Sequence, residues 1–153
     1  MKKQVAPRTM RELMTVKPVT VRPETTLVEL KKLFEEHDFD CFPVLDGNGV
    51  LVGVASQLDL LRAFRSADRI VRPDRRAAVA ERVVDVMSRG VVSVGPDDLL
   101  SDAIDLMVDF RLHTLPVVEK RMFDCHLLGL VSQKDVLRWL SMVEQPESAH
   151  PQT

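Results

Sequence analysis

The sequence predicts a mixed α+β protein built from two copies of one β-α-β-β-α unit. The chain matches itself at a nearly constant offset, and apolar residues within each copy recur first at strand spacing and then at helix spacing. In addition, the pattern Gly-x-x-Ser-x-x-Asp occurs once per copy, at 53–59 and at 129–135. Each occurrence follows an apolar run and precedes a helical pattern. The pattern therefore marks a strand that ends where a helix begins.

The internal match covers most of the chain. Met14 matches Met87 and Pro23 matches Pro96, an offset of 73 residues (87 − 14). At the glycines of the motif the offset is 76 (129 − 53), so the second copy has a hairpin loop that is longer by three residues. We divide the chain into a first repeat at 10–65, a basic connector at 66–82, a second repeat at 83–143 and a flexible tail at 144–153.

The elements follow the same order in both copies. A short strand, at 19–21 or 91–94, stops at a proline. An amphipathic helix then opens with acidic or hydroxyl residues, which are Glu24, Thr25 and Thr26 in the first copy and Asp97 and Asp98 in the second. Next come a strand (41–45 or 114–118), a turn and a second strand; Asp46-Gly47-Asn48-Gly49 is a strong hairpin signal. The last helix runs from Leu58 to about Phe64, or from Lys134 to about Val143. We expect these apolar residues to be buried: Leu27, Leu30, Phe34, Val44, Leu100, Met107 and Val117.

Composition narrows the class of protein. The chain has 153 residues, of which 45% are hydrophobic, and a formal net charge of −2. No global field favours nucleic acid or an acidic membrane, and no apolar run reaches the roughly 20 residues of a membrane-spanning helix. The N-terminal stretch has no apolar segment typical of a signal peptide, so we expect a cytoplasmic protein.

Two physical interpretations apply to the Ser-x-x-Asp junctions. The first backbone N–H groups of a helix have no intrahelical partner, so they can bind an anion such as phosphate. The same pattern is also a capping box, with Ser56 or Ser132 as the N-cap and Asp59 or Asp135 three residues later. For a single copy the capping interpretation is favoured, and the duplication raises the weight of the binding interpretation.

The order of short motifs, repeated twice, resembles a tandem pair of CBS domains. These motifs are Met-Ser/Thr, an apolar strand ending in Pro, Leu-Pro-Val-Val, and Gly-apolar-x-Ser/Thr-x-x-Asp, and together they cover about residues 10–143. The resemblance implies two repeats packed with pseudo-twofold symmetry and clefts for adenosine-containing ligands such as AMP, ADP, ATP or S-adenosylmethionine. It also implies frequent homodimers.

The resemblance assigns residues to two clefts. In each, the motif Asp would accept hydrogen bonds from both ribose hydroxyls, the motif Ser would contact ribose or phosphate, and residues of the opposite repeat would hold the base. The first cleft would consist of Ser56, Asp59, Ser88, Val92, Ser93, Leu112, His113 and Lys134. The second would consist of Ser132, Asp135, Thr15, Val19, Thr20 and Phe39.

Charge separates the two predicted clefts. His113 and Lys134 would offset a phosphate in the Asp59 cleft, whereas Asp40 stands at the corresponding position of the other cleft and would repel it. We therefore expect the nucleotide to prefer the Asp59 cleft. His113 as a surface histidine and Lys134 as a solvated lysine of the first helical turn remain the alternatives.

Other features point away from catalysis and metals. The connector arginines are interrupted by acidic residues and lack aromatic companions, which favours a solvated linker over a nucleic-acid site. Cys41 and Cys125-His126 lack further ligands at metal-binding spacing, and no arrangement of acid, base and nucleophile is visible.

We expect no enzyme and no required cofactor. The predicted function is a stand-alone regulatory module that binds an adenosine-containing ligand and signals to an unidentified protein target; the alternative is a dimerisation or protein-interaction module without a ligand.

Overall fold

The structure is a computed structural model and describes residues 8–68 and 81–143. The predicted tail, and residues 69–80 of the predicted connector, lie outside the described residues. The elements, in chain order, are α1 (Met10–Leu13), β1 (Thr15–Val16), α2 (Leu27–Glu36), β2 (Cys41–Leu45), β3 (Leu51–Ser56), α3 (Gln57–Asp68), α4 (Val83–Val86), α5 (Leu100–Phe110), β4 (Thr114–Lys120), β5 (Cys125–Ser132) and α6 (Gln133–Val143).

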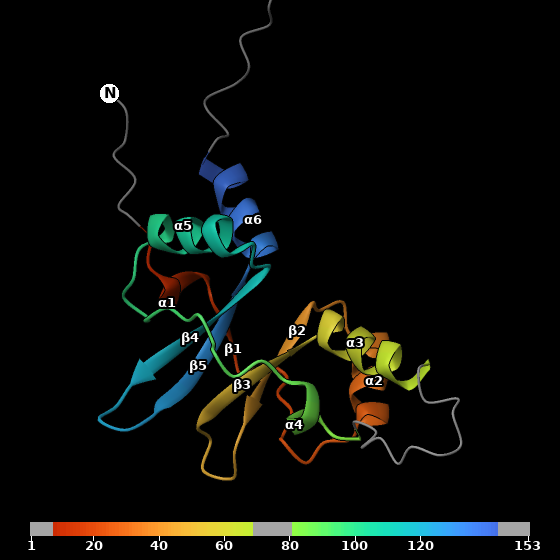
Figure 1. The fold of residues 1–153 in the computed structure, drawn as a ribbon. Helices are drawn as coiled ribbons and strands as arrows, with labels where there is room; N and C mark the ends of the chain where they lie inside the picture. Colours follow the sequence, from red (N-terminus) through yellow and green to blue (C-terminus); the bar gives the residue numbers. More distant parts are fainter. Residues whose placement is uncertain (1–7, 69–80, 144–153) are drawn as a thin grey trace, which may run out of the picture. The chain divides into compact units, whose positions relative to one another are not determined.

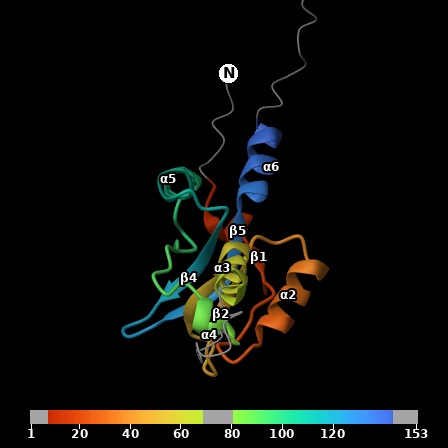
Figure 2. The ribbon, with the colours of Figure 1, turned by 45° about the vertical axis from the view of Figure 1, so that its right-hand side comes forward.

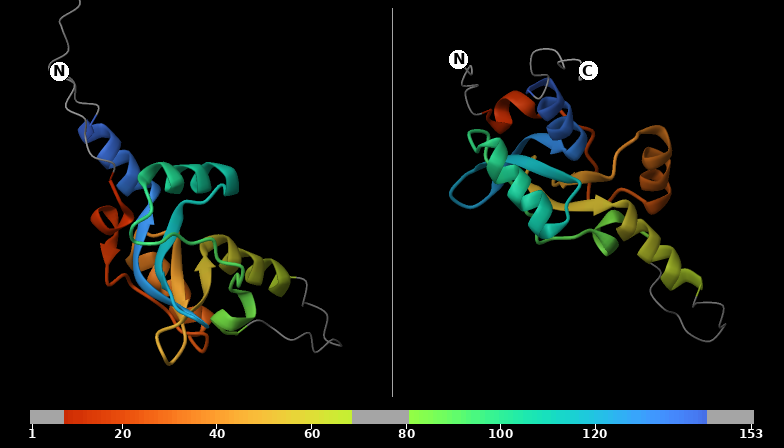
Figure 3. Two further views of the ribbon diagram at one scale, coloured as in Figure 1. Left: turned by 90° about the vertical axis from the view of Figure 1, so that its left-hand side faces the viewer. Right: turned by 90° about the horizontal axis from the view of Figure 1, so that it is seen from above.

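The described residues form two compact units that do not coincide with the two repeats. The first unit contains residues 18–68, 81–91 and 120–127, and the second contains 8–17, 92–119 and 128–143. The segment that leads into each repeat thus belongs to the unit of the other repeat. In Figure 1, α1 lies beside α5 and α6, whereas α4 lies beside α3, and Figures 2 and 3 show these neighbours from other sides.

The sheet of the first unit is built on the predicted hairpin. Strands β2 and β3 pair antiparallel, with Cys41 opposite Ser56 and Val44 opposite Gly53. On the far side of β3, Val54 and Ser88 exchange two backbone hydrogen bonds of 2.9 Å each. The segment before the second repeat therefore extends the sheet of the first.

The second unit repeats this arrangement with equivalent residues. Its sheet has the order β1-β5-β4, and Thr15 lies opposite Leu130. Thr15 is the repeat counterpart of Ser88, and Leu130 is that of Val54. The duplication seen in the sequence thus extends to the exchange of the leading segments.

The predicted first strand of each repeat is reduced to one bridging residue. Val21 pairs parallel with Val44, and Val94 pairs parallel with Val117. A parallel ladder that continued to Val19 would need a backbone N–H at Pro43, and one that continued forward would need an N–H at Pro23; proline has none. Pro116 and Pro96 stop the second ladder in the same way.

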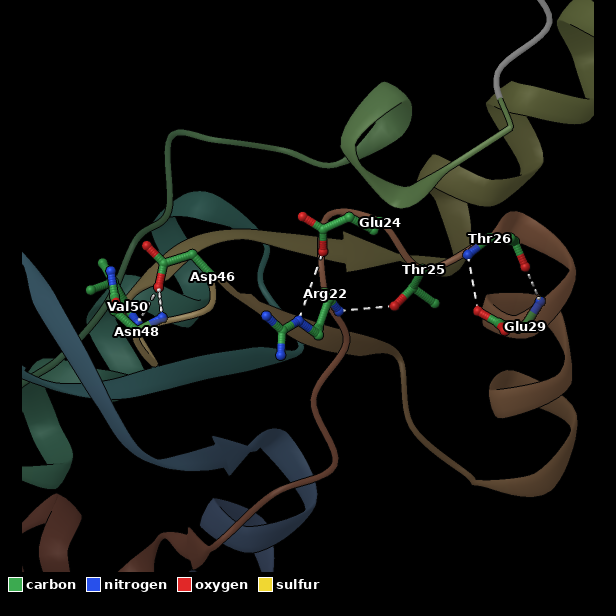
Figure 4. Close-up of polar contacts among 8 residues, drawn as sticks. All are labelled: Arg22, Glu24, Thr25, Thr26, Glu29, Asp46, Asn48 and Val50. Atoms are coloured by element: carbon green, nitrogen blue, oxygen red, sulfur yellow. Dashed lines mark hydrogen bonds and ion pairs between the residues drawn. The ribbon is translucent and has the colours of Figure 1, made fainter.

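Local hydrogen bonds fix the start of α2 and the hairpin turn (Figure 4). Thr26 Oγ1 accepts from the Glu29 N–H at 3.2 Å, and Glu29 Oε2 accepts from the Thr26 N–H at 3.1 Å, which completes a capping box. In the turn, Asp46 Oδ1 accepts from the N–H groups of Asn48 and Val50. Gly49 has a φ of 78°, a conformation in which glycine is favoured.

The opening of α5 differs from the prediction. Asp97 and Asp98 precede the helix rather than cap it, and Asp98 accepts from the Gly95 N–H at 2.7 Å to close a turn. Asp102 instead accepts from the N–H of Leu99, the N-cap residue. The acidic run therefore divides between a turn and a helix start.

Each unit has its own apolar core, completed by the exchanged segment. Met10, with no exposed surface, packs with Leu115, Val117 and Val131 in the second unit, and Val83 packs with Leu30 and Phe42 in the first. Of the seven residues expected to be buried, Phe34 is only partly so; its ring lies against Phe42 with 4.8 Å between centroids. Within the described residues, no helix is both long and apolar enough to span a bilayer.

Candidate ligand-binding site

The first motif lies at the junction of β3 and α3, in the first unit. Ser56 ends the strand, and Asp59 lies in the first turn of the helix. Asp59 Oδ2 accepts from the Ser56 N–H at 2.9 Å, while Ser56 Oγ accepts from the Asp59 N–H at 3.1 Å. The predicted capping box is therefore present, and it uses one oxygen of the carboxylate.

The other oxygen of Asp59 faces two further donors. Ser88 Oγ lies 3.4 Å from Oδ1, and Arg62 Nη1 lies 3.5 Å from the same atom. Asp59 is 3% exposed, and it is the one buried charged residue in the described part of the chain. Arg62 lies about one helical turn after Asp59 on α3, and its guanidinium forms an ion pair with the Asp59 carboxylate.

The second motif lies at the junction of β5 and α6, in the second unit. Asp135 Oδ2 accepts from both the N–H and the Oγ of Ser132, each at 2.9 Å. The Asp135 N–H donates to Ser132 Oγ at 3.2 Å. Asp135 is partly exposed, so its carboxylate is more accessible than that of Asp59.

At the start of α3 and of α6, a glutamine binds the loop that precedes β2 or β4. The Gln57 N–H donates to Asp40 O at 3.1 Å, and its side-chain amide donates to Phe39 O at 3.3 Å. In the second unit, Gln133 makes the same two bonds to His113 O at 2.8 Å and to Leu112 O at 2.9 Å. An identical glutamine at the same motif position was the sequence signal for this anchor.

The structure brings together some of the predicted site residues and separates others. Ser88 Oγ lies 3.4 Å from Asp59 Oδ1, and Thr15 pairs with the strand that ends at Ser132. The other residues predicted to serve the Asp59 cleft belong to the second unit: Val92, Ser93, Leu112, His113 and Lys134. Those predicted to serve the Asp135 cleft belong to the first unit: Val19, Thr20 and Phe39. Both clefts remain predictions, because each draws on both units.

The second unit also has an apolar groove on its helical side. The groove has a volume of about 440 Å³ and is lined by Ile104, Met107, Val108, Arg111, His113, Gln133, Val136, Leu137 and Leu140. Most of these side chains come from α5 and α6 and are aliphatic. Within the described residues, no three His, Cys, Asp or Glu side chains gather closely enough to hold a metal ion.

Comparison with known proteins decides the family. A model of the CBS domain matches residues 10–66 and, a second time, residues 83–142. The chain belongs to the CBS-domain family. Pairs of CBS domains are in general regulatory rather than catalytic modules.

Relatives of similar length share this organisation. The CBS domain-containing protein YhcV of Bacillus subtilis is 30% identical over 126 residues, which cover 82% of this chain and 81% of the relative. The crystal structure of CBSX2 in complex with AMP has a TM-score of 0.74 at 27% identity and covers 90% of this chain and 98% of that one.

A third comparison supports the fold alone. The CBS domain pair of protein MJ0100, crystallised with 5-methylthioadenosine and S-adenosyl-L-methionine, has a TM-score of 0.74 at 18% identity. It covers 89% of this chain and 98% of that one. The CBS-pair architecture is thus common to proteins of low sequence identity.

Proposed function

We propose that this protein is a regulatory module that binds an adenosine-containing ligand, of the AMP, ADP, ATP or S-adenosylmethionine type, at its Ser-x-x-Asp junctions. The observation that carries the proposal is the pair of junction carboxylates, each placed at a helix N-terminus by a strand and a capping serine. CBSX2, a relative at 27% identity, holds AMP. An ionised carboxylate offers two acceptor oxygens, which suit the two hydroxyls of a ribose.

We place the phosphate of the ligand near a helix start, because the dipoles of α3 and α6 are positive there and Lys134 adds a full charge in the first turn of α6. The predicted residues of the two clefts are retained in this proposal. Binding shifts the population of the conformations that a partner protein recognises, by as much as the ligand prefers one of them.

We also propose that the module forms a homodimer through the exposed apolar side chains of α3 and α6. Leu61 and Phe64 on α3 are 62% and 51% exposed, and Leu137 on α6 is 60% exposed. Leu137 and Leu140 line the groove between α5 and α6. Pairing of two copies would remove these side chains from water.

Isothermal titration calorimetry with AMP, ADP, ATP and S-adenosylmethionine tests the ligand proposal. Replacement of both carboxylates, Asp59→Asn with Asp135→Asn, should abolish measurable binding, because a hydrogen bond to a charged group contributes about 1.5–3 kcal/mol. Asparagine keeps an oxygen that can accept the serine N–H, so most of the capping is preserved, and urea denaturation checks that the variant folds. If the wild-type protein binds none of the four ligands, the ligand-free interaction module is the better explanation.

A further inference from the structure

The two motif carboxylates differ in how many of their acceptor sites are already used. At Asp59, the Ser56 N–H occupies Oδ2, and both Ser88 Oγ and Arg62 Nη1 lie within 3.5 Å of Oδ1. Asp59 is also 3% exposed. A ribose at this carboxylate must therefore displace protein donors before its own hydroxyls can bind.

Asp135 has the opposite arrangement. Both donors of Ser132 use Oδ2, and no other group among residues 8–68 and 81–143 donates to this carboxylate, which leaves Oδ1 available. The repeat counterparts of the extra Asp59 donors are Thr15 for Ser88 and Arg138 for Arg62. Both are exposed, and in the described part of the chain neither makes a hydrogen bond or ion pair with Asp135.

The exposure of Arg62 indicates how much its ion pair with Asp59 should lower the affinity of this carboxylate for the ligand. Its side chain is 66% exposed, so its ion pair with Asp59 is screened by water and weak. Release of such a pair changes an affinity by about two- to fivefold. The Ser88 hydroxyl at 3.4 Å adds a second long contact that the ligand must replace.

We infer that Arg62 competes with the ribose for Asp59, and that Asp135 is the carboxylate that binds the ligand first. This inference rests on the proposed function, and it reverses the site preference expected from the sequence. That expectation weighed the cations His113 and Lys134 against Asp40. The sequence does not show that Arg62 reaches back to Asp59, since a helical arginine three residues after an acid is more often solvated.

Calorimetric titration of AMP into single variants tests the order of the two sites. Asp135→Asn should weaken the tighter site by at least tenfold, whereas Asp59→Asn should change it by less than twofold. Arg62→Gln should tighten the weaker site by about two- to fivefold, and the matched change Arg138→Gln should leave both sites unchanged. In the double variant with Asp59→Asn and Arg62→Gln, the gain in affinity at the weaker site should be lost.

Adenosine, titrated alongside AMP, separates competition for the ribose from contact with the phosphate. If Arg62 competes with the ribose, Arg62→Gln strengthens adenosine and AMP equally. A weaker AMP site in Arg62→Gln, with adenosine unchanged, would show that Arg62 binds phosphate and would overturn the inference. So would a large loss in Asp59→Asn without one in Asp135→Asn. Failure of AMP to bind any variant or the wild type rejects the proposed function itself, and a site that appears only in Arg62→Gln supports the competition.

Discussion

The two motif glycines face a backbone carbonyl at a distance that leaves no room for a methyl group. An ideal Cβ at Gly53 would lie 2.8 Å from Ser88 O, and one at Gly129 would lie 2.6 Å from Thr15 O. In both units the carbonyl belongs to the exchanged segment, which pairs with β3 or β5 beside the glycine. The glycine that opens each motif therefore serves strand pairing, while the serine and aspartate shape the helix start.

Alanine at either glycine should destabilise the protein. Gly53→Ala and Gly129→Ala force the paired backbone to move, at an expected cost of about 1–3 kcal/mol in the free energy of unfolding. Urea denaturation followed by circular dichroism measures this loss. Gly90→Ala is the matched control, because a Cβ there meets nothing within 4 Å. Equal stability of all three variants would mean that the exchanged segments do not lie close to the glycines.

The Asp85 carboxylate is an acceptor for the short helix α4. The backbone N–H groups of Arg82 and Glu81 each donate to Oδ2 at 3.0 Å and lower the pKa of this carboxyl from its usual value. Because the pKa is lower in the folded state, the stabilisation is complete above the pKa of the unfolded chain, near 3.9. It is lost as the pH falls through the folded value.

Thermal unfolding across pH tests this contribution. Asp85→Asn should lower the Tm modestly at pH 7, and the difference from wild type should disappear as the pH falls below about 4. Added salt should reduce the difference at pH 7, since the carboxylate is solvent-exposed. Asp105→Asn, which removes the same charge from an exposed position on α5, is the control for net charge. A Tm difference that persists unchanged at pH 2.5 would contradict the assignment.

At the scale of elements, α1 and α4 have only four residues each and cannot be stable in isolation. Each is anchored by one fully buried side chain, Met10 in the second unit and Val83 in the first. Through these two side chains, the leading segment of each repeat packs into the core of the unit that contains the other repeat. Neither unit has a complete core without the segment supplied by the other repeat.

Truncation of the α1 anchor should destabilise the second unit. Met10→Ala leaves a cavity in a core that also contains Leu115 and Val131, and we expect a loss of about 2–4 kcal/mol in urea denaturation. Met122→Ala is the matched control, because this methionine is 88% exposed and its removal should change stability by less than about 0.5 kcal/mol. Similar effects of the two variants would indicate that α1 does not belong to the core.

Much of the element order could be predicted from the sequence. The offset of the repeat showed that the two copies have the same elements, and the hairpin turn at residues 46–49 is a local signal. The β2 strand has the predicted bounds, and Thr26, Ser56 and Ser132 cap their helices through the predicted patterns. The exchange of segments could not be predicted, because Met10 and Val83 lie in runs too short to show periodicity. The contact of Arg62 with Asp59 likewise depends on side-chain conformation, which a sequence pattern does not specify.

At the scale of the whole molecule, the chain divides in two ways. The repeats in the sequence give one set of boundaries, and the compact units of the structure give another. The CBS-domain matches follow the duplicated sequence, at 10–66 and 83–142. The compact units follow the packing, so that each includes a leading segment from the other repeat. The repeat therefore describes how the sequence is duplicated, and the units describe which residues share a core.

The last prediction concerns assembly. Sedimentation velocity at tens of micromolar should show a dimer for the wild-type chain and a monomer for Leu137→Glu. Leu137 is 60% exposed, and glutamate has a similar helix propensity, so the substitution should preserve α6 while placing a charge where the second copy would pack. The Kd of the dimer should rise by at least tenfold, because an unpaired charge removed from water costs several kcal/mol.

Met122→Glu serves as the matched substitution, since Met122 lies on the β4–β5 loop, outside the helices proposed to pair, and is 88% exposed. This variant should remain a dimer. A wild-type monomer at these concentrations would reject the homodimer, and dissociation by Met122→Glu alone would move the interface to the β4–β5 loop. A dimer that withstands Leu137→Glu would show that α6 lies outside the interface and that its apolar face serves another partner.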